Sequence, residues 1–96
     1  MQAQLIRHAK AVDELGNIVE TKMWKLPEPA ADKPHGYKYS LVYIVDDVRV
    51  IGYDNAEGRG DHRHIRGKIE AYKFVSLRKL THDFYRDIER YRKGEL

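Results

Sequence analysis

The chain has 96 residues, of which 18 are Lys or Arg and 15 are Asp or Glu, and it contains no Cys. This length predicts a single domain over residues 1–96, with one modest core that needs no covalent cross-link. The composition excludes disulfides, Cys-ligated zinc, iron–sulfur clusters and thiol catalysis. The longest apolar run covers only residues 41–45, so we expect a cytoplasmic protein with no membrane contact.

Charge is distributed unevenly along the chain. Residues 1–48 carry 6 basic and 7 acidic side chains, whereas residues 49–96 carry 12 basic and 8 acidic ones. The first half therefore has a net charge of −1 and the second half a net charge of +4. This asymmetry makes the second half the candidate surface for an anionic partner, and nucleic acid is the first expectation.

Two β-hairpins are predicted in the first half of the chain. Residues 5–12 and 18–26 form the first hairpin, with a turn over residues 13–17. Three Pro residues then predict a loop up to Gly36, because Pro cannot donate a hydrogen bond to a central strand. Residues 37–45 alternate cleanly, and residues 48–53 return after the tight turn at Asp46 and Asp47, which predicts the second hairpin.

The second half predicts a long loop, a strand and a helix. Residues 54–67 (DNAEGRGDHRHIRG) are almost free of apolar side chains and predict a functional loop. Residues 68–75 predict a last strand, after which Ser76 is a suitable N-cap and Gly94 a suitable helix end. Between them, apolar residues recur at helical spacing on one stripe: Leu77, Leu80, Phe84, Ile88 and Tyr91.

These elements predict an α+β fold. We expect an antiparallel sheet of about five strands, made of two hairpins and a last strand and covered on one face by the C-terminal helix. The predicted core consists of Trp24, Tyr39, Leu41, Tyr43, Leu80, Phe84 and Ile88.

The loop over residues 54–67 contains the strongest candidates for chemistry. In extended backbone, His62 and His64 would point to the same side, with Arg63 on the opposite side. Two imidazoles can serve as general acid and general base, because an ordinary His titrates near pH 6.5. Arginines can hold a phosphate through forked hydrogen bonds. Cleavage of RNA through its 2′-hydroxyl needs these groups and no cofactor. The predicted catalytic residues are His62, His64, Asp61 and Arg63, and the predicted RNA or phosphate contacts are Arg59, Arg66, Tyr53, Asp54 and Asn55.

Two alternatives remain open at this loop. His62 and His64 can bind a divalent metal together with Asp61, which would make a metal-dependent nuclease. A His-Arg-His tripeptide is also typical of a solvated loop, and the chain would then be a non-catalytic module that binds a partner protein or nucleic acid. The histidines outside this loop, His8, His35 and His82, are isolated and predict no role at the site.

The spacing also predicts how the paired histidines titrate. If Asp61 or Asp54 contacts one of them, the carboxylate raises the pKa of that His, and like-charge repulsion lowers the pKa of the other. The pair would then titrate in two separated steps. The same argument expects Tyr53 and Asn55 to pin the loop against the sheet.

One stretch of the sequence carries a more specific pattern. Residues 35–45 (HGYKYSLVYIV) are followed by residues 50–64 (VIGYDNAEGRGDHRH), in which a Gly-Tyr-Asp-Asn, a Gly-x-Gly and an Asp-His-Arg-His occur in order. This pattern resembles the TumE-type toxin family, whose members pair with an antitoxin in bacterial type II toxin–antitoxin loci. Residues 16–29 (GNIVETKMWKLPEP) and 74–90 (FVSLRKLTHDFYRDIER) fit the same family, so the resemblance covers nearly the whole chain.

The resemblance implies a growth-inhibiting toxin, a cognate DNA-binding antitoxin as its partner, and a cytoplasmic bacterial setting. It does not by itself imply a reaction, because fold and family likeness do not determine chemistry. Together with the residues of the loop, it leads us to expect an endoribonuclease that acts on RNA by His acid–base catalysis. A homodimer is compatible with these expectations.

Overall fold

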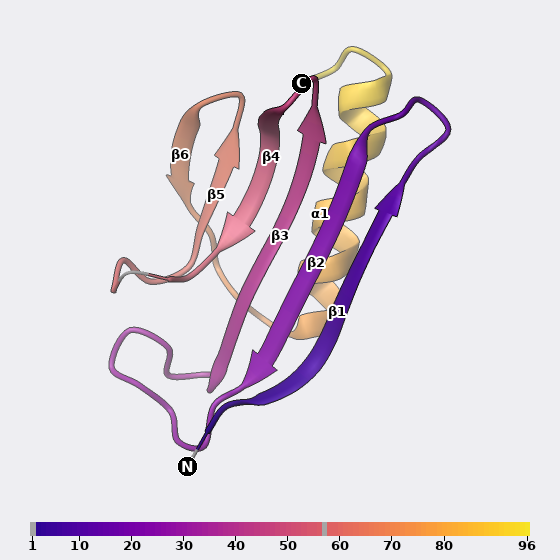
Figure 1. Ribbon diagram of the computed structural model, residues 1–96. Coiled ribbons are helices and arrows are strands. Elements are labelled where there is room, and N and C mark those ends of the chain that lie inside the picture. Colours follow the sequence, from indigo (N-terminus) through magenta and orange to yellow (C-terminus); the bar gives the residue numbers. More distant parts are fainter. Residues whose placement is uncertain (1, 57) are drawn as a thin grey trace.

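The computed structural model describes residues 2–56 and 58–96, which form a six-stranded sheet and one helix (Figure 1). The sheet is an antiparallel meander in which each strand pairs with the next one along the chain. In chain order the elements are β1 (Gln4–Val12), β2 (Ile18–Lys25), β3 (Tyr37–Val45), β4 (Val48–Asp54), β5 (His62–Ile65), β6 (Lys68–Ala71) and α1 (Leu77–Arg92).

The fold class is confirmed, whereas the number of strands is six and not about five. The prediction of a loop over all of residues 54–67 is wrong, because residues 62–65 form β5 and pair with β4. Arg66 and Gly67 both have positive φ angles, 49° and 85°, which suit a two-residue hairpin turn into β6. Strand β6 ends at Ala71 and not at residue 75, since the following residues leave the sheet for the helix. β5 was not predicted because its four residues are mostly charged or polar, so it lacks the apolar alternation by which a sequence indicates a strand.

The core lies between one face of the sheet and α1. Alternate residues of β3 and β4 point toward the helix, and Tyr39, Leu41 and Tyr43 are buried as predicted. The helix contributes the buried Leu80, Phe84 and Ile88, which confirms the predicted stripe. The prediction for Trp24 is wrong, because this residue is only partly buried. It pairs with Lys38, next to the helix-facing pair Met23 and Tyr39, and so lies on the other face of the sheet.

The ends of α1 follow the predicted signals. The side chain of Ser76 accepts a hydrogen bond from the backbone N–H of Lys79 at 3.0 Å, as an N-cap does. Gly94 follows the helix with a φ of 74°, the left-handed conformation that commonly ends a helix. No helix in the described part of the chain is long and apolar enough to cross a membrane.

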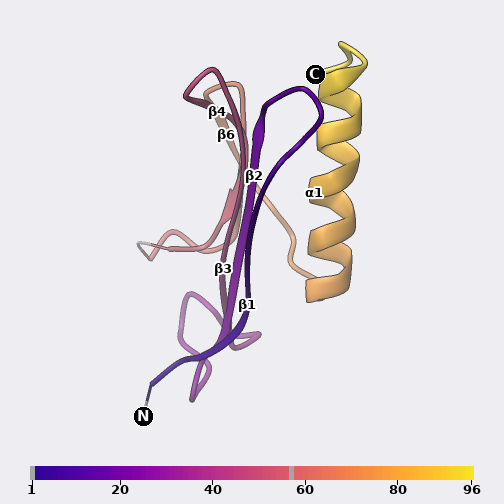
Figure 2. The ribbon, with the colours of Figure 1, turned by 45° about the vertical axis from the view of Figure 1, so that its right-hand side comes forward.

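Viewed along its edge, the sheet has two unlike faces (Figure 2). The helix packs against one of them, while the connection from β4 to β5 and the loop from β2 to β3 extend toward the other. We call this second face, which no helix covers in the described residues, the open face. It holds Gly52 and Asp54 of β4 and His62 and His64 of β5, and the candidate site is built there.

Candidate active site on the open face

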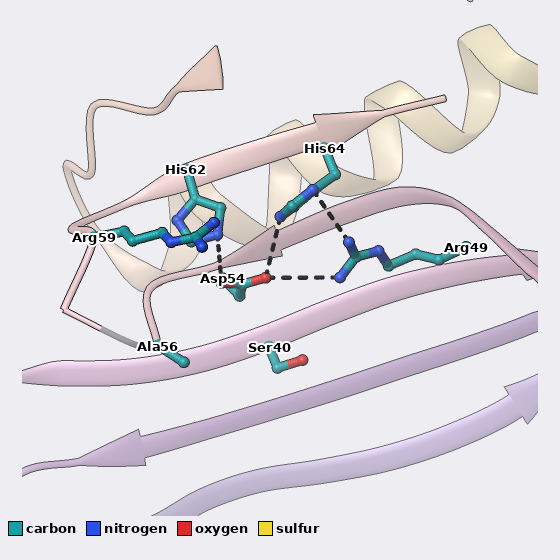
Figure 3. A pocket seen from close by; sticks show the side chains of 7 residues that line it. All are labelled: Ser40, Arg49, Asp54, Ala56, Arg59, His62 and His64. Carbon is teal, nitrogen blue, oxygen red and sulfur yellow. Dashed lines mark hydrogen bonds and ion pairs between the residues drawn. The ribbon is translucent and has the colours of Figure 1, made fainter. Parts of the chain in front are cut away.

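The antiparallel pairing of β4 with β5 brings two histidines and one carboxylate together. Asp54 lies opposite His62, and Gly52 lies opposite His64. Because side chains alternate along strands, all of these residues share the open face. They surround a cavity of about 320 Å³ (Figure 3). The residues that line it are Ser40, Arg49, Asp54, Ala56, Arg59, His62 and His64.

Asp54 is the centre of this cluster. Its Oδ1 lies 2.7 Å from Nε2 of His62, and its Oδ2 lies 3.5 Å from Nε2 of His64. Nη1 of Arg49 approaches Oδ2 at 3.9 Å. The sequence prediction offered Asp61 or Asp54 as the carboxylate beside the histidines, and the structure selects Asp54. One carboxylate therefore orients both imidazoles.

The ring of His62 lies between two acceptors. Its Nδ1 lies 3.0 Å from the carbonyl oxygen of Gly60, and its Nε2 faces the carboxylate of Asp54. Both of these partners accept hydrogen bonds and neither can donate one. A proton on either ring nitrogen therefore faces an acceptor, and the side chain is 9% exposed. In this geometry His62 is a proton donor held in place by two acceptors.

His64 has the opposite arrangement. Nη2 of Arg49 donates to Nδ1 of His64 at 3.1 Å, so Nδ1 must carry the lone pair and the ring proton must lie on Nε2. Burial lowers the pKa of His64, and the positive charge of Arg49 lowers it further, whereas Asp54 acts against both. The hydrogen bond from Arg49 and the lowered pKa both favour the neutral form of His64, while the two-step titration of the pair stays a prediction.

Arg49 reaches His64 because of a β-bulge and a glycine. The register between β3 and β4 shifts after the pair Tyr43 and Ile51, so that Arg49 pairs with Ile44. This irregularity turns an odd-numbered side chain onto the face of the even-numbered ones, as bulges beside functional sites often do. The side chain of Arg49 then lies over Gly52, where a Cβ would be only 3.0 Å from Cδ of Arg49.

Two predicted site residues, Asp61 and Asn55, do not line the cavity but hold the backbone around it in place. Asp61 accepts hydrogen bonds from the hydroxyl of Tyr39 at 2.6 Å and contacts Nε2 of His35 at 3.0 Å. Asn55 is fully buried and binds the backbone of Tyr37 and Tyr39. These contacts attach both ends of the connection between β4 and β5 to β3. Asn55 was expected to pin this connection together with Tyr53, but the Tyr53 hydroxyl binds Asp87 of α1 instead.

His35 was expected to be a plain loop residue, and it lies in the loop before β3. Its ring also stacks on Phe74 with the two centroids 3.9 Å apart. The sequence carried no signal that joins His35 to Asp61, because 26 residues separate them.

Three other predicted site residues lie away from the cavity. The hydroxyl of Tyr53 donates to buried Asp87 of α1, and Arg63 binds the same carboxylate and that of Glu70. Both therefore point toward the helix and not toward the open face. Arg66 donates to the carbonyl oxygen of Leu96 at 3.1 Å, on the turn after β5. The catalytic role predicted for Arg63 and the RNA or phosphate contacts predicted for Tyr53 and Arg66 gain no support from these positions.

Four groups at the site were not found in the sequence. Arg49 was taken as an ordinary strand residue, and the bulge that redirects it has no visible sequence signal. Ser40 belongs to a strand whose alternation predicted only packing, and Ala56 and Gly60 carry no functional side chain. Arg59 was predicted, and it lines the cavity as an exposed residue.

Comparison with known proteins identifies one family. The family model described as Toxin TumE matches residues 2–92 of the chain. No curated protein and no solved structure matches the sequence.

Proposed function

The chain belongs to the TumE toxin family, and from this premise we propose that it inhibits growth as a metal-independent endoribonuclease of a type II toxin–antitoxin pair. Membership in a toxin family implies a cognate antitoxin as partner. The observation that carries the catalytic part of the proposal is the contact of two imidazoles with Asp54, of which only His64 accepts a hydrogen bond from Arg49.

The proposed reaction uses His64 as the general base. The phosphate of a bound RNA attracts the guanidinium of Arg49 away from Nδ1 of His64, which leaves the lone pair of Nδ1 free. Nδ1 then takes the proton of the 2′-hydroxyl, and the 2′-oxygen attacks the adjacent phosphorus. A lowered pKa keeps His64 in the neutral, proton-accepting form.

His62 completes the reaction as the general acid. The bond from phosphorus to the 5′-oxygen breaks, and this oxygen takes the Nε2 proton of His62, which gives up its contact with Asp54. The products are a 2′,3′-cyclic phosphate and a 5′-hydroxyl. Asp54 stabilises the imidazolium before transfer and orients the ring, while Arg49 and exposed Arg59 offset the charge that develops on the phosphoryl oxygens.

Replacement of each His tests this assignment. We expect His62→Ala and His64→Ala each to reduce RNA cleavage by about 10²- to 10⁴-fold, the usual contribution of a general acid or base. Both variants should abolish growth inhibition in cells that express them. His82→Ala is the matched control, since this His is exposed on α1 and should retain full activity.

The outcome that would contradict the proposal is equally clear. Undiminished cleavage and toxicity in both variants would exclude His acid–base catalysis. Purified protein that cleaves no RNA between pH 5 and 9, but forms a stoichiometric complex with a target, would favour a non-catalytic toxin.

A metal-dependent nuclease is the second candidate, and one observation favours it. Ligand atoms of Asp54, His62 and His64 all lie within 4.8 Å of one another, and carboxylate and imidazole ligands suit zinc and similar ions. His62 would keep its contact to the carbonyl of Gly60, as a metal-bound His commonly does. His64 would first have to lose the hydrogen bond from Arg49, since that bond puts the ring proton on the nitrogen that faces the carboxylate.

Dialysis against a chelator separates the two candidates. Metal-independent catalysis predicts full activity after dialysis and no stoichiometric metal by elemental analysis. Loss of activity that returns on addition of one divalent ion would establish the metal-dependent reaction.

A further inference from the structure

The open face continues beyond the cavity, across β3 and onto β2. Ser40, which lines the cavity, lies opposite Asp54 on one side and opposite Lys22 on the other. Two residues further along β2 lies Trp24, paired with Lys38 of β3. A row of side chains thus leads from the imidazoles to the only Trp of the chain.

Trp24 is placed on this face as an accessible aromatic surface. It is partly buried on a sheet face that no helix covers in the described residues. Its neighbour on β1 is Leu5, which is 55% exposed, and Nζ of Lys38 lies 5.4 Å from the centroid of the indole ring. A large aromatic ring flanked by cations is the arrangement that single-stranded nucleic acids use for base stacking.

We propose that the open face of β2 and β3 is a binding site for single-stranded RNA, in which an unpaired base next to the cleaved bond stacks on Trp24. The flanking phosphates then contact Lys22 and Lys38. This inference rests on the proposed function, and it names the class of RNA that the cavity receives.

The distances along the sheet suit such a strand. Neighbouring strands lie about 4.8 Å apart, and diagonal neighbours on adjacent strands are about 7–8 Å apart. The register makes Trp24 a diagonal neighbour of Ser40, which lines the cavity. One extended RNA strand can therefore place a base on Trp24 and its adjacent phosphate in the cavity. A duplex would not fit this site, because its bases are stacked on each other and unavailable to the indole.

The charges on this face complement a phosphate backbone. Lys10, Lys22, Lys38, Arg49 and Arg59 are the basic side chains on or beside it. The two carboxylates on the same strands are already occupied, since Glu20 contacts His8 at 3.0 Å and Lys22 at 3.9 Å, and Asp54 contacts His62. The cations therefore exceed the carboxylates on the path that the strand follows.

The fluorescence of Trp24 reports this contact directly, because no other Trp contributes to the emission. The probe is a short 2′-O-methyl oligoribonucleotide, which the proposed reaction cannot cleave because the attacking hydroxyl is blocked. We expect saturable quenching of the emission by the single strand and no change with a duplex of the same sequence. Quenching should weaken as salt rises, since phosphate contacts release counterions.

Variants of Trp24 separate stacking from folding. Trp24→Leu should weaken binding of the oligonucleotide by about tenfold, with KM raised and kcat retained, whereas Trp24→Phe should stay within about threefold of the parent. Lys22→Gln should flatten the salt dependence of binding, and Lys93→Gln, at the exposed C-cap of α1 and away from the open face, is its matched control. Thermal unfolding shows whether each variant is folded.

The results that overturn this inference differ from those that overturn the proposed function. Unchanged Trp24 emission at saturating RNA, with cleavage still lost in the His62 and His64 variants, rejects the stacking site alone. Emission that responds to a protein partner and not to RNA would assign the face to a protein interface and reject the site as well. A parent protein that neither binds nor cleaves RNA rejects the proposed function itself.

Discussion

The two faces of the ribbon formed by β4 and β5 carry the same kinds of side chains and use them differently. On the open face, Asp54 lies between His62 and His64 beside a cavity (Figure 3). On the helix face, Tyr53 and Arg63 meet Asp87 of α1. Adjacent residues in one short strand thus belong to two different polar clusters.

The side chains of the cluster on the helix face bind one another. Asp87 is fully buried and accepts hydrogen bonds from Tyr53 and Arg63 through Oδ2. Among the described residues its Oδ1 has no hydrogen-bond partner, so the charge depends on these two donors. Burial raises the pKa of Tyr53, and its hydrogen bond to Asp87 raises it further, so the phenol stays protonated as a donor.

The two clusters differ in their access to solvent, and this difference distinguishes a structural cluster from a functional one. A buried carboxylate such as Asp87 needs donors inside the protein. Its donors, Tyr53 and Arg63, are already engaged and do not face a ligand. The open-face cluster has the same chemistry next to a cavity, where a phosphate can replace one partner. The experiments below test this separation, from the largest expected effect to the smallest.

Asp54→Asn should have the largest effect, and on activity alone. An amide cannot stabilise the imidazolium of His62 as a carboxylate does, so we expect cleavage to fall by about 10²-fold. The melting temperature should change little, because the site is at the surface of the sheet. Activity within threefold of the parent would show that Asp54 does not organise the site.

Arg63→Met should act on stability alone. Removing one partner of a fully buried ion pair costs about 3–5 kcal/mol, and the 24% exposure of Arg63 reduces our expectation to about 2 kcal/mol. Urea titration measures this loss, and the folded fraction should retain its kcat. Glu70→Gln is the control, since Glu70 is 53% exposed and its pair with Arg63 should contribute less than about 1 kcal/mol. A variant with parental stability and lost activity would place Arg63 in the site.

Tyr53→Phe should have a smaller effect of the same kind. It removes one of two donors to Asp87 while the ring remains packed edge-on against Phe84. We expect a loss of about 1–2 kcal/mol in the free energy of unfolding, the usual cost of an unsatisfied buried group. Cleavage by the folded enzyme should be unaffected, and an unchanged urea midpoint would contradict the buried hydrogen bond.

The pH dependence should show the smallest effect. Because folding lowers the pKa of His64 from its ordinary 6.5, the unfolded chain binds this proton at a higher pH than the folded chain does. The free energy of unfolding should therefore fall as the pH drops below about 6.5. For the same reason, the acid limb of kcat/KM should lie below pH 6.5.

Arg49 provides the test of this pH argument. Arg49→Gln removes a nearby positive charge, and Gly52→Ala crowds the Arg49 side chain, so both should raise the pKa of His64. The acid limb should then move to higher pH in both variants, and proton NMR of the His64 ring gives the same shift directly. An unmoved limb would show that Arg49 does not control the proton of His64.

The sequence by itself determined the antiparallel sheet, the C-terminal helix and most of the core. These features follow from local patterns, namely the alternation over residues 37–45, the turn at Asp46 and Asp47, and the helical stripe that ends before Gly94. The pairing of His62 with His64 on one side of the chain also followed from spacing, since alternate residues of extended backbone share a face.

Only the tertiary structure decided which residues surround these histidines. Asp54 faces them because β4 and β5 pair in one register, and Arg49 joins them because a bulge reverses its face. Arg63 and Tyr53 leave the site because α1 offers a buried carboxylate, and Trp24 leaves the core because the helix covers the opposite face. Local sequence patterns encode the spacing of side chains along one strand, whereas contacts between strands and with the helix depend on residues distant in sequence, and the composition of the site depends on those contacts.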